Sequence, residues 1–520
     1  MKTMDKCLEI VGNNGKFQKN IIYICFLSSL LTTFYTIIIS FLKPPDFFVI
    51  NKNNPNEKPI KLPYSKEICD KSKYEIKKDI KSIHNWTYEF DLYCEREYLN
   101  TLITYSILIS LLLATVFLTP IPDKYGRKNI FKFFIALSLI VHINLMLVIN
   151  PLHIIISTFL GCLTAFSYYM GFYIIVEFIR SDLTGSVLGI FNAAYPLFGI
   201  FLGFFFLTVN NCRILFLITT ILSIILTYLT FNYFTESPWW LYSMGKKKEC
   251  LEVLTFIAKV NEKENEWNDF QKNNIDIING IEKKKDENSQ IKNYNIIEIL
   301  SFPSQRKKII LLCCLWFISG MNFFGILLNL GHMKGDFFMN SILSFSGEMI
   351  SELGSGYLAD IKGRIWVMKY SSYLGSISFL IYKFVGKNLK SFFVMGSMFG
   401  FAAVYNVLGI YVPENFPVFI RGNVTGFLII IMRFAPMLVP FLTNILGQNV
   451  DYIFITLGFF AGFILNFLDE TFGKPIIENI PEEEDNNLKN KFLHIKEERK
   501  IKVNDSVIFR RLSSGSISVK

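Results

Sequence analysis

The stretch GSGYLADIKGR, residues 354–364, ends a long apolar run with an acidic residue, a glycine and two basic residues. A second stretch, TPIPDKYGRKN at residues 119–129, ends another apolar run in the same way. Asp123 and Asp360 are 237 positions apart, so the two stretches occupy equivalent places in two successive parts of the chain. This spacing predicts an internal duplication.

The composition indicates a membrane protein. The chain has 520 residues, of which 51% are hydrophobic and 18% charged, and its mean hydropathy is +0.36, whereas soluble proteins carry about 25% charged residues. The net charge of +10 comes mainly from lysines between the apolar runs and in the tails. These charges suit a lipid bilayer surface. No basic patch with interleaved aromatic residues occurs, so we expect no nucleic-acid partner.

Apolar runs of about 20 residues, the length that crosses a bilayer as a helix, recur along the chain. Twelve are predicted, at residues 21–43, 101–119, 131–149, 152–175, 186–208, 213–234, 309–331, 337–358, 367–386, 392–412, 424–446 and 451–468. We therefore predict an all-α integral membrane fold with twelve transmembrane helices in two six-helix halves. The expected divisions are an N-terminal segment (1–20), a first half (21–234) with an external loop (44–100), an internal loop with short helices (235–308), a second half (309–468) and a disordered tail (469–520).

Basic residues in short loops predict the orientation, because such loops stay in the cytoplasm. The loops DKYGRKNIFK and DIKGRIWVMK place both termini inside a multi-pass protein, which we expect in the plasma membrane. Segment 44–100 is then external, where Asn85-Trp86-Thr87 is a glycosylation sequon. Cys69 and Cys94 are the cysteines in this segment, so we predict a disulfide between them.

The two charged stretches are predicted to form a latch on the inner face. Gly356 would let two helices approach closely, and Arg364 would bridge to a neighbouring carboxylate or a helix C-terminus. The alternative is that both are only positively charged loops that set the topology. The predicted latch residues are Asp123, Gly126, Arg127, Glu177, Gly356, Asp360, Gly363 and Arg364.

At these residues the sequence resembles the major facilitator superfamily, whose signature is G-x-x-x-D-x-x-G-R. The second copy fits it completely, whereas Thr119 and Pro120 stand where the first copy should have glycine. Further stretches resemble the branch of organic cation, organic anion and carnitine transporters: LEIVGNNGKFQ (8–18), EFDLYCEREYL (89–99), ESPWWLYSMGKKKECLEVLTFIAKVN (236–261), YVPENFPVFIRG (411–422) and DETFGKPI (469–476).

Ionisable residues inside spans are expensive and usually face a cavity or a partner. Glu348 and Glu352 are four positions apart and share one helix face, and Arg433 lies within the eleventh run. These residues form either a structural ion network or part of a substrate cavity. The resemblance places Arg433 where anion and carnitine carriers have arginine and cation carriers have aspartate. Glu352, in contrast, stands where some anion carriers have lysine. Arg433 and Glu352 could therefore bind the two opposite charges of a zwitterion, or they could pair with each other and leave an apolar cavity.

Aromatic residues are predicted to supply the rest of the pocket. Trp316 and Phe323, seven positions apart, share one helix face, with Phe324 beside them. The resemblance adds Tyr195, Tyr405 and Asn406, at positions that line the cavity in relatives. Such a pocket would suit an amphiphilic organic ion.

We predict a transporter rather than an enzyme. The sequence has no Walker loop and no nucleophile elbow, and its histidines and cysteines show no metal-ligand spacing, so no metal or cofactor is expected. The expected function is secondary-active or facilitative transport of a small organic ion by alternating access, favouring an anion or zwitterion, with a coupling ion or counter-substrate as a further partner. The alternatives are a polyspecific organic cation transporter and a transporter-like sensor that no longer turns over.

Overall fold

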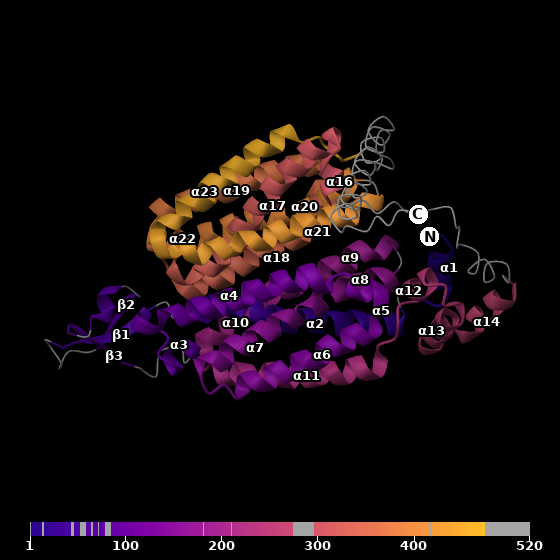
Figure 1. The fold of residues 1–520 in the computed structure, drawn as a ribbon, viewed down its shortest axis with the longest axis horizontal. Coiled ribbons are helices and arrows are strands. Elements are labelled where there is room, and N and C mark those ends of the chain that lie inside the picture. The colour runs from indigo at the N-terminus through magenta and orange to yellow at the C-terminus, as the bar shows by residue number, and fades with distance from the viewer. Residues whose placement is uncertain are drawn as a thin grey trace, which may run out of the picture.

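The computed structural model is almost entirely helical, and its long helices form two groups that lie side by side (Figure 1). It describes residues 2–12, 15–42, 46–52, 59–63, 66–70, 72–77, 85–179, 181–209, 211–273, 296–416 and 418–473. Most of the predicted tail, from residue 474 onward, lies outside the described residues.

The long helices follow the predicted apolar runs. The first half contains α2 (Lys16–Leu42), α4 (Glu97–Leu113) with a π-helical turn (Ala114–Leu118), α5 (Ile121–Tyr125), α6 (Lys128–Met146), α7 (Pro151–Thr164), α8 (Phe166–Phe178), α9 (Ser181–Asn192), α10 (Ala194–Thr208) and α11 (Cys212–Tyr233). The second half contains α16 (Ile296–Leu300), α17 (Pro303–Asn329), α18 (Phe337–Lys362), α19 (Arg364–Phe384), α20 (Lys390–Asn415), α21 (Val418–Phe434), α22 (Val439–Leu446) and α23 (Val450–Ile464). A 3₁₀ turn at Ala435–Leu438 separates α21 from α22, next to prolines that cannot continue the helical hydrogen bonds.

The predicted count of twelve spans is not confirmed when the helices are judged by their length and apolar content. Within the described residues, ten helical stretches are long and apolar enough to cross a membrane. The two remaining expected spans are the helices α18 and α19, of 26 and 21 residues. Both are long enough to span, but charged and polar side chains, including Glu348 and Glu352 in α18, lower their apolar content.

A small sheet projects from one end of the first half (Figure 1), which we call the sheet end; the sequence did not predict it. Strand β1 (Asp46–Asn51) pairs antiparallel with β2 (Ile60–Pro63) on one side and β3 (Tyr74–Lys77) on the other. Two short helical segments follow, α3 (Trp86–Glu89) and a 3₁₀ turn (Cys94–Arg96). The predicted disulfide between Cys69 and Cys94 is present, with their Cα atoms 5.4 Å apart.

The sequon residue Asn85 is part of this packing. Its side chain caps α3 by accepting a hydrogen bond from the Tyr88 N–H at 3.3 Å. Its Nδ2, the atom that would carry a glycan, donates to the Phe41 carbonyl oxygen at 2.9 Å, and the residue is 3% exposed. A glycan needs an exposed side chain, so the folded structure argues against the predicted glycosylation of Asn85.

The two halves are closed against each other at the sheet end. The Ser40 hydroxyl of α2 donates to the Leu327 carbonyl of α17 at 2.8 Å, and the Phe41 and Phe337 rings lie edge to face, 5.3 Å between centroids. Helices α10 and α18 also pack closely, because Gly199 on α10 leaves room for the Phe345 ring on α18. The pocket described below is therefore covered on this side.

At the opposite end, short helices form a cap on the first half (Figure 1). They are α1 (Lys2–Ile10), α12 (Pro238–Ser243), α13 (Lys247–Val260) and α14 (Glu264–Asn273). Asn261 joins the cap to the start of the chain: its Nδ2 donates to the Val11 carbonyl and to Gln18 Oε1 at 2.8 and 2.9 Å, and its Oδ1 accepts from the Phe17 N–H at 2.9 Å.

Replacing Asn261 by alanine is expected to release α1 from the other helices of the cap. Each hydrogen bond contributes about 0.5–1.5 kcal/mol net, so the loss of this set should destabilise the docking of α1 by about 1–3 kcal/mol. Hydrogen exchange of the α1 amides should then be about 5 to 150 times faster. Lys259→Ala, which changes an exposed residue of α13, is the matched control, and unchanged α1 exchange in Asn261→Ala would contradict this role.

Candidate functional site

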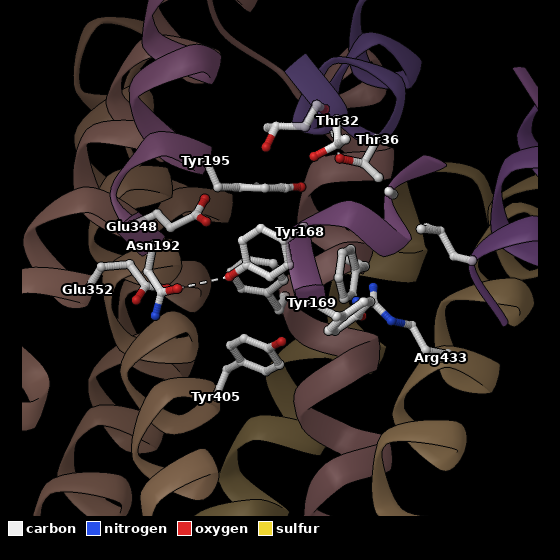
Figure 2. Close-up of a pocket in the computed structure, with 15 residues that line it drawn as sticks. Thr32, Thr36, Tyr168, Tyr169, Asn192, Tyr195, Glu348, Glu352, Tyr405 and Arg433 are labelled. Carbon is white, nitrogen blue, oxygen red and sulfur yellow. Dashed lines mark hydrogen bonds between the residues drawn. The ribbon is translucent and has the colours of Figure 1, made fainter. Parts of the chain in front are cut away.

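A pocket lies between the two halves and takes side chains from both (Figure 2). Its empty volume is about 630 Å³, including the space at its mouth. It is lined by Thr32, Thr33 and Thr36 of α2, Leu111 of α4, Ala165, Tyr168 and Tyr169 at α8, Asn192 and Tyr195 at α9 and α10, Phe323 and Phe324 of α17, Glu348 and Glu352 of α18, Tyr405 of α20 and Arg433 of α21.

Arg433 stands on one wall of the pocket (Figure 2). Its Nη2 donates a hydrogen bond to the Tyr169 hydroxyl, which comes from the other half of the molecule. The guanidinium carbon lies 5.2 Å from the centroid of the Phe324 ring, within the range of a cation–π interaction. Its Nε is buried and has no hydrogen-bond partner in the part of the chain that the structure describes. Among the described residues, neither Glu348 nor Glu352 forms an ion pair with Arg433, so the predicted ion network is not formed here.

The two carboxylates occupy the opposite wall (Figure 2). Glu348 is 2% exposed, and its buried Oε2 has no hydrogen-bond partner among the described residues. Glu352 follows one turn later on α18 and is half-buried. The pocket therefore presents a positive group on one side and acidic groups on the other.

Aromatic rings line the pocket between these two walls. The Tyr405 ring is stacked on Phe323, 5.2 Å between centroids. The Tyr168 hydroxyl donates to Asn192 Oδ1 at 3.0 Å. Rings of this kind offer flat apolar faces with few polar anchors, which suits an organic ion with an apolar body.

Two predicted pocket residues lie behind the lining. Trp316 is 4% exposed and meets the Tyr405 ring edge to face at 6.1 Å. Asn406 turns toward α18, where its Nδ2 donates to the Ser355 hydroxyl at 3.5 Å. The lining residues that sequence reasoning missed are Thr32, Thr33, Thr36, Leu111, Ala165, Tyr168, Tyr169 and Asn192. Polar side chains at helical spacing in the first run, Thr32 and Thr36, were the available signal.

The structure assembles the predicted latch residues into two similar clusters at the end opposite the sheet. In the first, Arg127 Nη2 lies 2.9 Å from Asp123 Oδ1 and 2.8 Å from Glu177 Oε1. In the second, Arg364 lies 2.9 Å from Asp360 Oδ1 through Nη1 and 3.0 Å from Glu414 Oε1 through Nη2. Sequence reasoning missed Glu414, although it follows Glu177 by the same 237 positions that separate the two aspartates.

A third carboxylate supports each cluster from the segment after the last helix of its half. The backbone N–H of Arg127 donates to Glu236, and that of Arg364 donates to Glu470, both at 2.8 Å. Burial alone would raise the pKa of Glu470, but four backbone N–H donors outweigh it, so its pKa is lowered from 4.5. The carboxylate therefore stays ionised at neutral pH and holds the start of α19.

The glycines of the latch have different roles. Gly126 and Gly363 have φ angles of 94° and 96°, which other residues adopt only with strain, and a Cβ there would press on Glu236 and Glu470. At Gly356 the expectation of a close helix approach is wrong, because an added Cβ would meet only Ile410 Cδ1, at 3.8 Å.

Replacing Glu414 by alanine is expected to destabilise the second cluster. Glu414 accepts hydrogen bonds from Arg364 and from the Thr471 hydroxyl, and its side chain is 26% exposed. The expected loss is about 1–2 kcal/mol, seen as a lower unfolding temperature of the purified protein. Asp360→Ala removes the other partner of Arg364, whose side chain is 66% exposed, and should have a smaller effect. Equal effects of the two variants would contradict this ranking.

Comparison with known proteins identifies the family of this chain. The family model for sugar (and other) transporters matches residues 24–481. Organic cation/carnitine transporter 4 of Arabidopsis thaliana is 23% identical over 353 residues, which cover 63% of this chain and 66% of that protein. Solute carrier family 22 member 13 and organic cation/carnitine transporter 2, both of Homo sapiens, are each 22% identical, and their matches cover 75% of this chain and 70% of each protein.

Solved structures show the same fold. The inward-open xylose transporter XylE of E. coli superposes with a TM-score of 0.60 at 14% identity, covering 88% of this chain and 98% of that one. A further XylE structure, described as a major facilitator superfamily proton:xylose symporter, gives a TM-score of 0.56 at 15% identity. The relatives are transporters and not enzymes, as predicted. The chain therefore belongs to the sugar (and other) transporter family of the major facilitator superfamily, and it is a multi-pass membrane transporter of the solute carrier 22 type.

Proposed function

We propose that the protein carries a small organic anion or zwitterion across the membrane by alternating access, with the pocket between its halves as the binding site. The observation that carries this proposal is the set of contacts that Arg433 makes and lacks. This arginine faces the pocket, is without an ion-pair partner among the described residues, and has a buried Nε that no acceptor meets.

An arginine in the interior of a membrane protein needs something to offset its loss of hydration. Tyr169 supplies a neutral hydrogen bond and its ring, and Phe324 supplies a second ring, with the guanidinium carbon 5.9 and 5.2 Å from the two ring centroids. These neutral contacts replace only part of the water. A substrate carboxylate would add a charge-assisted bond, and the planar guanidinium can bind such a group through two parallel N–H donors. An anionic group of the substrate therefore completes this wall of the pocket.

The opposite wall favours a positive group at the other end of the substrate. Glu352 would attract an ammonium, and the faces of Tyr168 and Tyr405 would stabilise it. This arrangement supports a zwitterion, and it is also the observation that favours the second candidate, an organic cation. For the cation alone, however, Arg433 would be a repulsive neighbour.

The surrounding structure supports alternating access in this proposal. The pocket is covered at the sheet end by contacts between the halves, while each latch cluster joins residues of one half only. The halves can therefore rock about the pocket as units. We place the latch end and both termini in the cytoplasm and the protein in the plasma membrane, because the loops beside Arg127 and Arg364 are basic.

Uptake competition tests the substrate class. Cells expressing the full chain would be given labelled glutarate, carnitine or tetraethylammonium, each with the other two as unlabelled competitors. We expect saturable uptake of glutarate or carnitine, with weak competition by tetraethylammonium. Uptake of tetraethylammonium alone would favour the cation carrier, and binding of a probe without any uptake would favour the sensor.

A further inference from the structure

Glu348 is the most isolated charged side chain on the carboxylate wall of the pocket. It is 2% exposed, and its buried Oε2 finds no hydrogen-bond partner within the residues that the structure describes. The same holds there for the buried hydroxyl oxygens of Ser344 and Ser351, one turn before and one turn after it on α18. A carboxylate that is ionised in such a place lacks the donors that would replace its water.

Glu352 differs from Glu348 although it lies on the same face of α18. It is half-buried. None of its oxygens is among the buried atoms without partners in the described part of the chain. Of the two carboxylates, Glu348 therefore gains more from losing its charge.

The charged and titratable groups that face Glu348 come from five helices. They are Glu352 of α18, Tyr195 of α10, Tyr405 of α20, Tyr168 and Tyr169 of α8, and Arg433 of α21. With both glutamates ionised, this pocket holds one positive and two negative charges, and it repels an anion. A proton on Glu348 makes the net charge of these three groups zero.

We propose that Glu348 binds one proton together with each substrate molecule and releases it on the other side, so that the protein is a proton-coupled symporter. This inference rests on the proposed function, because it assumes that an anionic substrate group binds to Arg433. Protonation of Glu348 removes a negative charge that would repel this group. The proton moves from water in the open pocket to a carboxylate oxygen of Glu348. It crosses as the halves rock, and it returns to water when the pocket opens on the far side.

A proton suits Glu348 better than a metal cation does. A proton neutralises the carboxylate without further ligands, whereas a metal cation needs a shell of several oxygens.

Proteoliposomes that contain the full chain and a trapped pH dye test the coupling. Labelled glutarate and carnitine serve as probes, and liposomes without protein correct for passive leakage. With the wild-type protein, the lumen should acidify as the probe enters, by about one proton per molecule. The initial rate of probe uptake should fall as the outside pH rises. The fall should reach about tenfold per pH unit in the range where Glu348 is mostly ionised and therefore inactive.

The variants locate the proton. In Glu348→Gln, whatever probe flux remains should carry no proton and lose its pH dependence, whereas Glu352→Gln should keep the wild-type ratio of protons to probe. If Glu348→Gln moves no probe, calorimetry of probe binding in two buffers with different ionisation enthalpies replaces the flux. It should show proton uptake by the wild-type protein and none by Glu348→Gln.

The failures are distinguishable. Probe flux without protons, stimulation by a sodium gradient instead of a proton gradient, or an unchanged proton ratio or proton uptake in Glu348→Gln would overturn this inference and leave the proposed function standing. Absence of flux for every probe with the wild-type protein would overturn the proposed function and this inference with it.

Discussion

Replacing Arg433 by alanine is expected to lower the apparent affinity for an anionic probe by about tenfold to a hundredfold. The change removes a charge-assisted contact to a substrate carboxylate, worth about 1.5–3 kcal/mol. The protein should still reach the cell surface, because Arg433 is bound by the neutral Tyr169 and Phe324 and its loss leaves no carboxylate without its ion-pair partner. Glutarate uptake over a range of concentrations, normalised to surface protein, measures the effect.

Arg421→Ala is the matched control for Arg433→Ala. Arg421 lies on the same helix, and its guanidinium donates to the Phe416 carbonyl oxygen outside the pocket. We expect it to leave the affinity for glutarate near the wild-type value. Normal glutarate uptake by a well-expressed Arg433→Ala protein would refute the substrate role. Misfolding of Arg433→Ala that Glu352→Gln repairs would show that Glu352 is the partner of Arg433 instead.

Replacing Gly199 by leucine is expected to prevent closure at the sheet end and so stop the transport cycle. A Cβ at Gly199 would already press on the Phe345 ring, and a ring buried between two halves has little room to move. Overpacking costs about 1–3 kcal/mol, so the closed state should be about 5 to 150 times less populated. Transport should fall accordingly, and a cysteine introduced at Thr36 in the pocket should react faster with an impermeant reagent applied from the sheet side.

Gly189→Leu is the control for this prediction, because no atom lies within 4 Å of the place where its Cβ would be built. It adds the same side chain in the same half of the protein, at a place where the added Cβ presses on no neighbour. Normal transport by Gly199→Leu, at wild-type surface levels, would show that the α10–α18 contact does not have to form during the cycle.

The duplication explains why so much of the latch could be predicted from sequence. A spacing of 237 positions relates Asp123 to Asp360 and Glu177 to Glu414, and each arginine binds the carboxylates of its own half. Repeated spacing is visible in a linear sequence. The supporting residue Glu470 breaks this spacing, since it follows Glu236 by 234 positions, and only the structure places it.

The pocket was predicted less completely, because its contacts join distant parts of the chain. Arg433 was identified as an ionisable residue within an apolar run, but its partner Tyr169 is 264 positions away, in the other half. Trp316 shares a helix face with Phe323, yet it lies behind Tyr405, since the rotation of a helix relative to its neighbours is set by packing.

Asn85 shows the same limit in segment 44–100. The sequon is a local pattern, whereas the burial of its amide depends on the Phe41 carbonyl at the end of α2. The small sheet was missed for a related reason. Its strands are only four to six residues long, too short to show a clear alternation of apolar and polar residues, and their pairing joins separate parts of the segment.

Counterflow tests the central claim, that one pocket between the halves serves both sides of the membrane in turn. Proteoliposomes with the wild-type protein would be loaded with unlabelled glutarate, or left empty, and given labelled glutarate outside. Alternating access predicts saturable uptake that is faster into the loaded vesicles, because bound glutarate returns the pocket to the outside. Uptake that rises linearly with concentration and ignores the load would contradict the account, as would binding of glutarate with no uptake at all.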